Sequence, residues 1–175
     1  RAGWEYLRNV QHTDGSFAPL WFGCEKAADE LNATYGTTHV LFACEGDAQY
    51  GRTVRGPALT WLRSIQNSDG GFGGCKGAPS TAEETGLALR ALAADSDAHA
   101  EACMRAAQWL IERQRADGSW DAAPIGFYFA VLWYHEETYP LCYALGGLNA
   151  WAAAQGARVG RESASRSRLE PVGHV

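Results

Sequence analysis

Residues 66–74 read QNSDGGFGG, and nearly the same phrase occurs twice more, as QHTDGSF at 11–17 and QRADGSW at 114–120. In each copy an Asp-Gly pair begins three residues after a Gln, and an aromatic residue stands six residues after it. One such copy would be an ordinary Asp-Gly turn. Three copies with the same internal spacing predict a structural repeat. We call the segments that begin at Gln11, Gln66 and Gln114 the first, second and third phrase.

The residue types of the phrase predict how it joins two helices. Each Gln ends a run with helical periodicity, so its amide can reach the free backbone groups of the following loop and lie flat on an aromatic ring. The Asp side chain can bond its own backbone in the turn, where Gly supplies a positive φ. The predicted structural residues are the glutamines and aromatics of the phrases: Gln11, Phe17, Gln66, Phe72, Gln114 and Trp120.

Further apolar runs predict the helices that the phrases connect. One run follows each phrase, and another precedes the third phrase, at about 34–46, 80–94, 126–154 and 99–114. Apolar spacings of three and four residues are typical of amphipathic helices, and no stretch shows sustained period-two alternation. We therefore expect an all-α fold of tandem helical hairpins that forms part of a closed ring.

Two local signals predict where helices begin. Ser80 and Glu83 have the spacing of a capping box just before an apolar run. Pro57 follows Gly56 and predicts a first helical position there.

The predicted domain covers residues 1–155. Residues 156–175 are rich in Ser and Arg and almost devoid of apolar side chains, which favours a disordered, solvated tail over a lipid-binding one. The chain starts with Arg1 in mid-pattern, and its only methionine is Met104. We therefore expect a longer polypeptide whose N-terminal part is missing from this sequence.

Composition argues against several classes of protein. The net charge is −5, whereas nucleic-acid binding requires a basic surface. No run approaches the roughly 18 to 20 apolar residues that cross a bilayer. The five cysteines are scattered without a C-x-x-C motif, which indicates reduced thiols and neither a disulfide framework nor a zinc site.

The phrase resembles the QW repeat of the triterpene cyclases, that is, squalene-hopene cyclases and their oxidosqualene relatives. The segments TYGT at 34–37, STAEETGLALRAL at 80–92 and the run from QRADGSW to ALGGL are similar to blocks of that family in the same order. The resemblance covers residues 1–152 and corresponds to the last third or so of a squalene-hopene cyclase.

The resemblance implies both a fold and a chemistry. The fold would be part of an α/α toroid. The activity would be acid-initiated carbocationic cyclisation of squalene or a related polyprenoid to a polycyclic triterpene, without a cofactor or metal. The protein would lie monotopically on a membrane lipid surface, on its cytoplasmic side.

The acid of this family lies in an Asp-x-Asp-Asp motif, which this chain lacks. The nearest match is Asp95-Ser96-Asp97-Ala98, which has no final Asp and is interpreted as a polar link between helices. We therefore expect this chain to supply wall residues of the pocket and to be inactive alone, because the general acid is not in it.

The resemblance also implies roles for individual residues. Tyr35 would help to hold the water network that reloads the acid, Phe127 would stabilise a late cation, and Phe129 and Tyr134 would line the substrate pocket. Ordinary core packing is the alternative for all four. This chain departs from the family's usual residues at Ala123 and Val131, where hopene-forming members have a Phe and a Tyr, and so predicts a differently shaped pocket.

Two rival interpretations stay open. YPLCYALGGL resembles a segment of protein prenyltransferase β-subunits, but Pro140 replaces the zinc-binding His and Glu83-Glu84-Thr85 stands where Asp-x-Cys would be. The HEE at 135–137 lacks the second His of H-E-x-x-H, so no metal site is predicted. The other rival is a non-catalytic repeat scaffold that kept the shape of the toroid.

Overall fold

The computed structural model describes residues 2–47, 49 and 51–169, of which 162–169 are described by their backbone alone. Within these residues six α-helices and one two-stranded hairpin follow one another along the chain. They are α1 (Ala2–Val10), α2 (Ala33–Gly46), α3 (Arg52–Ser64), α4 (Ala82–Ala93), α5 (Ala100–Arg113), β1 (Pro124–Phe127), β2 (Leu132–His135) and α6 (Thr138–Leu169). The helices predicted at 34–46, 80–94 and 99–114 are confirmed as α2, α4 and α5.

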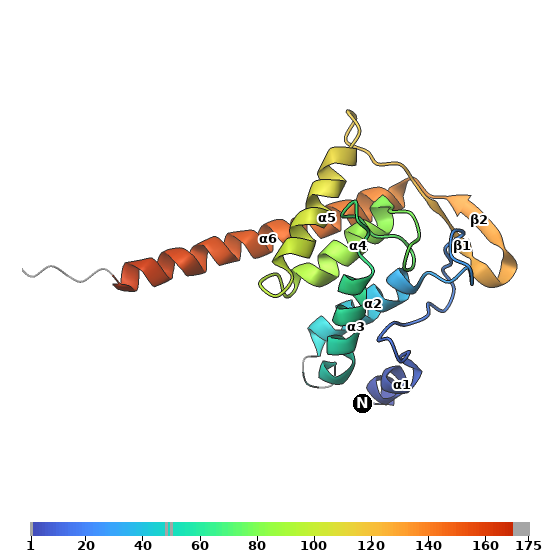
Figure 1. Cartoon of the computed structure of the whole chain (residues 1–175), viewed down its shortest axis with the longest axis horizontal. Coiled ribbons are helices and arrows are strands. Elements are labelled where there is room, and N and C mark those ends of the chain that lie inside the picture. Colours follow the sequence, from blue (N-terminus) through green and yellow to red (C-terminus); the bar gives the residue numbers. More distant parts are fainter. Residues whose placement is uncertain (1, 48, 50, 170–175) are drawn as a thin grey trace, which may run out of the picture.

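The helices form two rows, as expected for part of an α/α toroid (Figure 1). In the inner row α4 packs between α2 and α6. In the outer row α1 packs on α3, while α3 and α5 pack on α4. Each phrase leaves the end of an outer helix and leads towards the next inner element, so the repeat of the sequence is also the repeat of the fold.

Helix α4 is the centre of this arrangement. All of its residues except Arg90 are buried, because other helices pack on several sides of it. Its crossing with α6 is especially close at two glycines. A Cβ added at Gly86 would lie 2.3 Å from Tyr143 O, and one added at Gly147 would lie 2.5 Å from Gly86 O. The missing side chains therefore allow the two backbones to touch.

The phrases adopt one local structure. The Asp carboxylate accepts the backbone N–H two residues further on, at 2.9 to 3.0 Å, and the following Gly has a φ between 87° and 98°. Both features were predicted. The aromatic residue at the end of each phrase is buried in the core: Phe17, Phe72 and Trp120.

Each phrase Gln holds its own loop, and two of them also hold the next outer helix. Gln11 Nε2 donates to Gly15 O at 2.9 Å and to Val54 O of α3 at 3.0 Å. Gln66 Nε2 donates to Gly70 O at 2.8 Å and to Ala102 O of α5 at 2.9 Å. The predicted contact between each Gln and the loop backbone is confirmed, and the bond to the neighbouring helix adds a link between consecutive hairpins.

The segment predicted as a single helix over 126–154 instead starts with a β-hairpin. β1 and β2 are antiparallel, with Ile125 opposite Tyr134 and Phe127 opposite Leu132. Val131 takes a left-handed conformation with φ 47°, which turns the chain after the short 3-10 segment at 128–130. Helix α6 begins only at Thr138, so the apolar run at 127–134 was wrongly interpreted as helical.

Two predicted helix starts are also wrong. The cap of α4 is Thr81, whose hydroxyl accepts Glu84 N at 3.2 Å, so the capping pair lies one residue later than Ser80 and Glu83. Pro57 lies inside α3 and not at its start. The helix begins earlier because Arg55 N already donates to Gly51 O at 3.0 Å.

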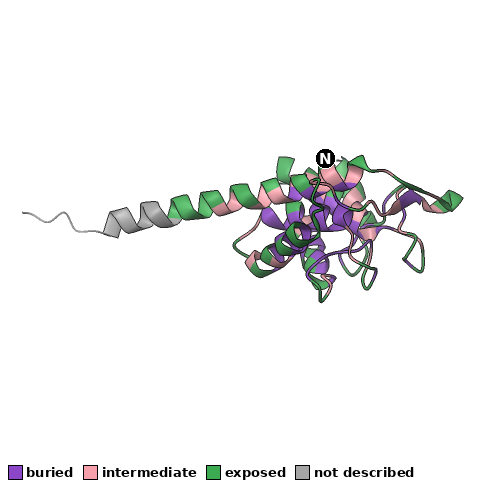
Figure 2. Ribbon diagram, turned by 90° about the horizontal axis from the view of Figure 1, so that it is seen from above, coloured by how far each residue is buried: buried purple, intermediate pink, exposed green. Residues whose placement is uncertain are grey.

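Helix α6 continues into the segment predicted to be a disordered tail. Residues 156–169 are helical, which differs from the prediction, whereas residues 170–175 lie outside the described residues. The side chains are mostly exposed where α6 extends beyond the other helices (Figure 2). A salt bridge from Arg161 Nη2 to Asp97 Oδ2, at 3.1 Å, ties this part of α6 to the loop between α4 and α5.

Candidate active-site wall

Aromatic rings from three separate segments meet beside the start of α2. The segments are the loop at 21–22, helix α2 and the hairpin at 127–129, which lie together in Figure 1. Segment 22–23 runs along β1, because Gly23 N donates to Gly126 O at 2.9 Å. We call this group the aromatic cluster; its members are Trp21, Phe22, Tyr35, His39, Phe42, Phe127, Tyr128 and Phe129.

Tyr35 is held at the first turn of α2. Asn32 caps this helix by accepting Tyr35 N at 2.9 Å. The Tyr35 ring lies 4.0 Å from the His39 ring and 4.5 Å from the Phe22 ring, measured between centroids. Its hydroxyl bonds that of Tyr143 on α6, and burial raises the pKa of both phenols, so both keep their protons at neutral pH.

The hairpin supplies the other predicted pocket residues. The centroid of Phe127 lies 6.4 Å from that of Phe22, 6.2 Å from that of Trp21 and 5.8 Å from that of Phe129. Phe127 is half-buried, whereas Phe129 is 63% exposed. The structure therefore brings Tyr35 and Phe127 to the same surface, joined through Phe22.

Three further positions discussed from the sequence lie on or next to the hairpin: Tyr134, Val131 and Ala123. Tyr134 on β2 is an electrostatic neighbour of Tyr35, outside the aromatic cluster itself. Val131 is 64% exposed at the turn of the hairpin, and Ala123 precedes β1. The roles that the resemblance implies for Tyr35, Phe127, Phe129 and Tyr134 stay predictions.

Several members of the cluster were not predicted. Tyr35, His39 and Phe42 follow one another at spacings of four and three residues, which places them on one face of α2. That spacing was visible in TYGTTHVLF once the helix was assigned. Trp21 and Phe22 carried a weaker signal, because a loop position gives no indication of where an aromatic ring will point.

Two adjacent carboxyl groups are buried at the start of α4. Glu84 Oε1 accepts Asn32 Nδ2 at 2.7 Å, and its other oxygen contacts the Thr81 hydroxyl. Glu83 Oε1 accepts Ala123 N at 2.9 Å. Burial, followed by the neighbouring Glu83, raises the pKa of Glu84 to about 7, and burial raises that of Glu83 as well. The pair joins α4 to the cap of α2 and to the segment that leads into the hairpin.

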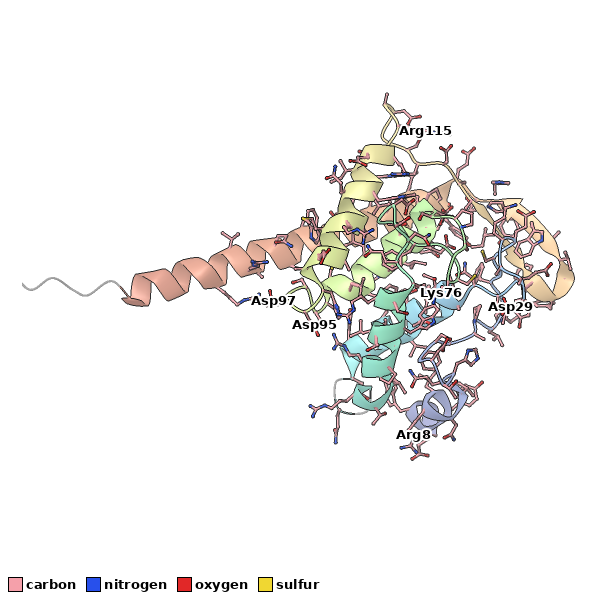
Figure 3. The ribbon with its side chains drawn as sticks, in the orientation of Figure 1. Arg8, Asp29, Lys76, Asp95, Asp97 and Arg115 are labelled. Atoms are coloured by element: carbon pink, nitrogen blue, oxygen red, sulfur yellow. The ribbon has the colours of Figure 1, made fainter. Side chains whose placement is uncertain are left out.

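The near match to the acid motif lies at the opposite end of α4. Asp95 and Asp97 stand in the loop before α5 (Figure 3), where Asp95 Oδ2 is 3.6 Å from Arg55 Nη1 and Asp97 pairs with Arg161. These are surface ion pairs, remote along α4 from the end that carries Glu84. Among the described residues, no three His, Cys, Asp or Glu side chains form a group that could hold a metal ion.

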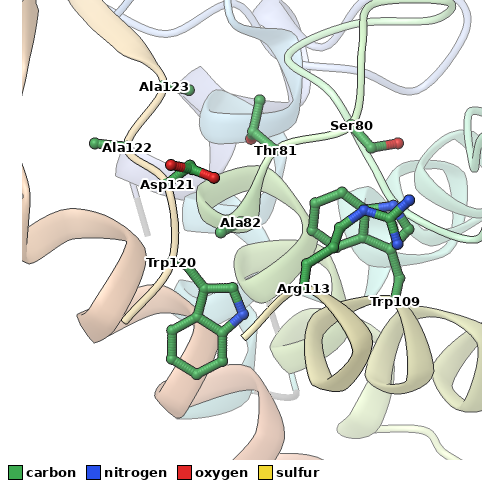
Figure 4. Close-up of a pocket in the computed structure, with 9 residues that line it drawn as sticks. All are labelled: Ser80, Thr81, Ala82, Trp109, Arg113, Trp120, Asp121, Ala122 and Ala123. Atoms are coloured by element: carbon green, nitrogen blue, oxygen red, sulfur yellow. The ribbon is translucent and has the colours of Figure 1, made fainter. Parts of the chain in front are cut away.

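A cavity of about 350 Å³ lies beside α5 (Figure 4). Trp109, Trp120 and Arg113 line it, with the Arg113 guanidinium 4.3 Å from the centroid of the Trp109 ring. Its lining also includes the start of α4 and the segment 120–123, and it shares no residue with the aromatic cluster, so the two are separate features.

The sequence profile of the squalene-hopene cyclase C-terminal domain matches residues 1–150 of this chain. The chain belongs to this family. It is 36% identical to a squalene–hopene cyclase of Bradyrhizobium diazoefficiens, in a match that covers 68% of this chain and 19% of the relative. It is 32% identical to a drimenyl diphosphate synthase of Streptomyces showdoensis, in a match that covers 68% of this chain and 22% of the relative.

A solved structure has the same fold. The ent-copalyl diphosphate synthase from Streptomyces platensis superposes with a TM-score of 0.60 over 87% of this chain and 27% of that one, at 19% identity. These matches confirm the expected α/α toroid. The family match places the chain with cyclases.

The match is to part of each relative. This cyclase-family chain spans about a fifth of the length of the curated relatives it matches. In the part of the chain that the structure describes, no helix is both long enough and apolar enough to cross a membrane.

Proposed function

We propose that this chain is the C-terminal segment of a squalene-hopene cyclase-type enzyme and supplies part of its pocket wall. The reaction would be the acid-initiated, carbocationic cyclisation of squalene or a related polyprenoid to a polycyclic product. The observation that carries this proposal is the aromatic cluster, which three distant segments of a cyclase-family fold assemble on one surface.

The cluster suits the charge that forms in such a reaction. A cation over an aromatic face gains roughly 0.5 to 2 kcal/mol, and more where water is excluded. Rings fixed before the reaction can lower the energy of a cationic transition state without reorganising. Phe127 and Phe22 are fixed in this way by the contact between segment 22–23 and β1.

The initiating acid would come from another part of the same polypeptide. The third phrase supports the presence of another part of the polypeptide. It has the same turn as the first two phrases, each of which binds the next outer helix through its Gln. In the first two phrases Gln11 and Gln66 bond the next outer helix, whereas Gln114 Nε2 donates to Gly118 O, at 3.0 Å, and to no other described residue. We propose that a further outer helix of the full-length protein packs there.

We also propose that the full-length protein lies on the cytoplasmic side of a membrane as a monotopic protein. The reason is chemical, since squalene is a lipid and must leave a bilayer to react. Exposed apolar side chains near the aromatic cluster, such as Leu20 and Leu132, would face either the substrate or another part of the polypeptide.

The test is to incubate the full-length protein with squalene and, separately, with a prenyl diphosphate, because drimenyl diphosphate synthases are among its relatives. Cyclic product is expected from the wild type. Phe127→Ala is expected to reduce its formation by about tenfold or to release less cyclised products, since about 1 to 2 kcal/mol of cation stabilisation is lost.

A matched control is Tyr6→Ala, which removes an exposed aromatic ring from α1, away from the cluster. It is expected to leave the product unchanged. Binding of a polyprenoid without any conversion by the wild type would favour the non-catalytic scaffold over the enzyme.

A further inference from the structure

The aromatic cluster has two sides, and consecutive residues of α4 are bonded to both. Tyr35 on α2 belongs to one side and Phe127 on β1 to the other, with the Phe22 ring between them. Glu84 is bonded to the cap of α2, and Glu83 is bonded to the residue before β1. We call Glu83 and Glu84 the carboxyl pair. The separation of the two sides therefore depends on two neighbouring positions of one helix.

The connection from Glu84 to Tyr35 passes through one buried side chain. Glu84 Oε1 accepts Asn32 Nδ2 at 2.7 Å, and Asn32 Oδ1 accepts Tyr35 N at 2.9 Å. Asn32 is 2% exposed, so water does not replace either partner. Leaving a buried amide unpaired is costly, which keeps the Asn32 side chain bonded to Glu84. The first turn of α2, which carries Tyr35, is thus fixed relative to α4.

The connection from Glu83 to Phe127 passes through the start of β1. Glu83 Oε1 accepts Ala123 N at 2.9 Å, and β1 begins at the next residue, Pro124. A residue before proline is restricted to extended conformations, and proline itself has a fixed φ. The chain is therefore stiff immediately after the bond to Glu83, and Phe127 lies only four residues beyond Ala123.

Packing is incomplete around the segment that contains Ala123. The cavity of about 350 Å³ lies along residues 120–123. Figure 4 shows Ala122 and Ala123 on one side of this cavity and Trp109 on the other. Because the segment lacks packing on its cavity side, the bond to Glu83 has a large share in placing it.

The carboxyl pair acts through accepted hydrogen bonds. Both side chains are nearly fully buried, with 4% of Glu83 and 8% of Glu84 exposed. A carboxyl keeps an accepting oxygen whether it is ionised or protonated, and the amide of a glutamine has one as well. The bonds to Ala123 N and Asn32 Nδ2 therefore do not require a charge, and a glutamine would preserve them.

We propose that the carboxyl pair positions the two sides of the aromatic cluster relative to each other, an inference that rests on the proposed function. Neither carboxyl needs to touch the substrate. Glu83 acts through β1 on Phe127, which is expected to face a cation formed late in the cyclisation. Glu84 acts through Asn32 on Tyr35, which is expected to lie near the initiating acid. Loss of the two bonds should therefore affect different stages of one reaction.

The experiment uses the full-length protein and measures kcat for total conversion together with the distribution of products by number of rings. Glu83→Ala leaves Ala123 N without its acceptor. We expect products with fewer rings to increase about tenfold relative to the fully cyclised product, because a displacement of about 1 Å can cost up to a hundredfold in rate. Glu84→Ala is instead expected to lower kcat about tenfold and to keep the distribution of products.

Two variants serve as controls. Glu83→Gln retains an oxygen that can accept Ala123 N, so it is expected to form products in the wild-type distribution. Val54→Ala removes buried atoms from α3 in the outer row and controls for loss of stability, which urea unfolding measures in each variant. It is expected to keep both the wild-type kcat and the wild-type distribution.

A double substitution separates positioning from general packing. If Glu83 acts through Phe127, adding Glu83→Ala to Phe127→Ala should change the distribution little beyond Phe127→Ala alone, because the ring that the bond positions is already absent. Independent effects that multiply in the double variant would show that Glu83 acts by another route.

The outcomes are distinct. A wild-type distribution in Glu83→Ala, a wild-type kcat in Glu84→Ala, or a Glu83→Gln variant that behaves like Glu83→Ala would overturn the positioning role and leave the proposed function intact. A wild type that forms no cyclic product from squalene or from a prenyl diphosphate would overturn both.

Discussion

Glu84 shows how the surroundings of one residue change its chemistry. Its side chain is buried between Asn32 and Thr81, and the carboxyl of Glu83 is its neighbour in the chain. Burial and that neighbour raise its pKa from 4.5 to about 7. The folded protein therefore holds the Glu84 proton more tightly than the unfolded chain does, and it is most favoured where the carboxyl is protonated.

This linkage predicts a loss of stability as the pH rises. The contribution of the proton is complete below about pH 4.5 and is lost by the time the pH has passed 7, a difference of about 3 kcal/mol. Glu84→Gln keeps the size of the side chain and its hydrogen-bonding partners but cannot ionise. We expect the variant to match the wild type in urea at pH 5 and to be about 2 to 3 kcal/mol more stable at pH 8.

Glu101→Gln is the control, because Glu101 is exposed on α5. It is expected to keep the pH dependence of the wild type. Parallel curves for Glu84→Gln and the wild type between pH 5 and pH 8 would show that Glu84 is already ionised in the folded protein.

Among the elements, the crossing of α4 with α6 depends on the absence of side chains. Gly147→Ala would place a methyl group against Gly86 O and force the helices apart. We expect a loss of about 1 to 3 kcal/mol, as for other overpacked cores, measured by denaturant unfolding.

The neighbouring Gly146 offers a matched control, since a Cβ there would meet nothing within 4 Å. Gly146→Ala should stabilise α6 by roughly 0.5 to 1 kcal/mol through helix propensity alone. Equal effects of the two substitutions would mean that the close crossing does not limit stability.

Helices and turns were predicted most accurately where the apolar periodicity and the residue types of the adjoining loop indicated the same structure. The residue types of the phrases predicted their turns, and the apolar runs beside them predicted the helices α2, α4 and α5. The run at 127–134 has helical spacing, yet its backbone is a hairpin whose β1 also bonds segment 22–23. A partner more than 100 residues away in the chain decides that outcome, and no local pattern contains it.

Some residues of the aromatic cluster could be predicted from local sequence patterns, and others depend on contacts between distant segments. The four residues carried over from the family were placed on or beside one surface. Trp21 enters the cluster through its long-range contacts with Phe127 and Phe129, and Phe22 contacts both Phe127 and Tyr35. His39 and Phe42 needed only the helical periodicity of α2. The buried state of Glu83 and Glu84 could not be predicted, because it depends on Asn32 and Ala123 arriving from other segments.

Across the whole molecule, the first two phrases each pack against the next outer helix, whereas the third phrase has no such helix among the described residues. A Cβ at Gly15 would lie 2.3 Å from Pro57 O, and one at Gly70 would lie 2.9 Å from Arg105 O, because the next outer helix lies against each phrase. At Gly118 the nearest atom would be Gln114 Nε2 at 3.9 Å. All three glycines have a positive φ, so replacing any of them with alanine would strain the backbone to a similar extent. The three positions differ in the space that is free for the added methyl group.

This difference tests the proposed packing of a further helix on the third phrase. In the 175-residue chain, Gly118→Ala should cost only the strain of its positive φ, roughly 1 to 2 kcal/mol. Gly70→Ala should cost about 1 kcal/mol more, because its methyl group also meets α5. In the full-length protein a helix on the third phrase would add the same steric cost at Gly118, and the two substitutions should then lower the free energy of unfolding equally. If Gly118→Ala remains the milder change there, the third phrase is open in the whole protein and no outer helix packs on it.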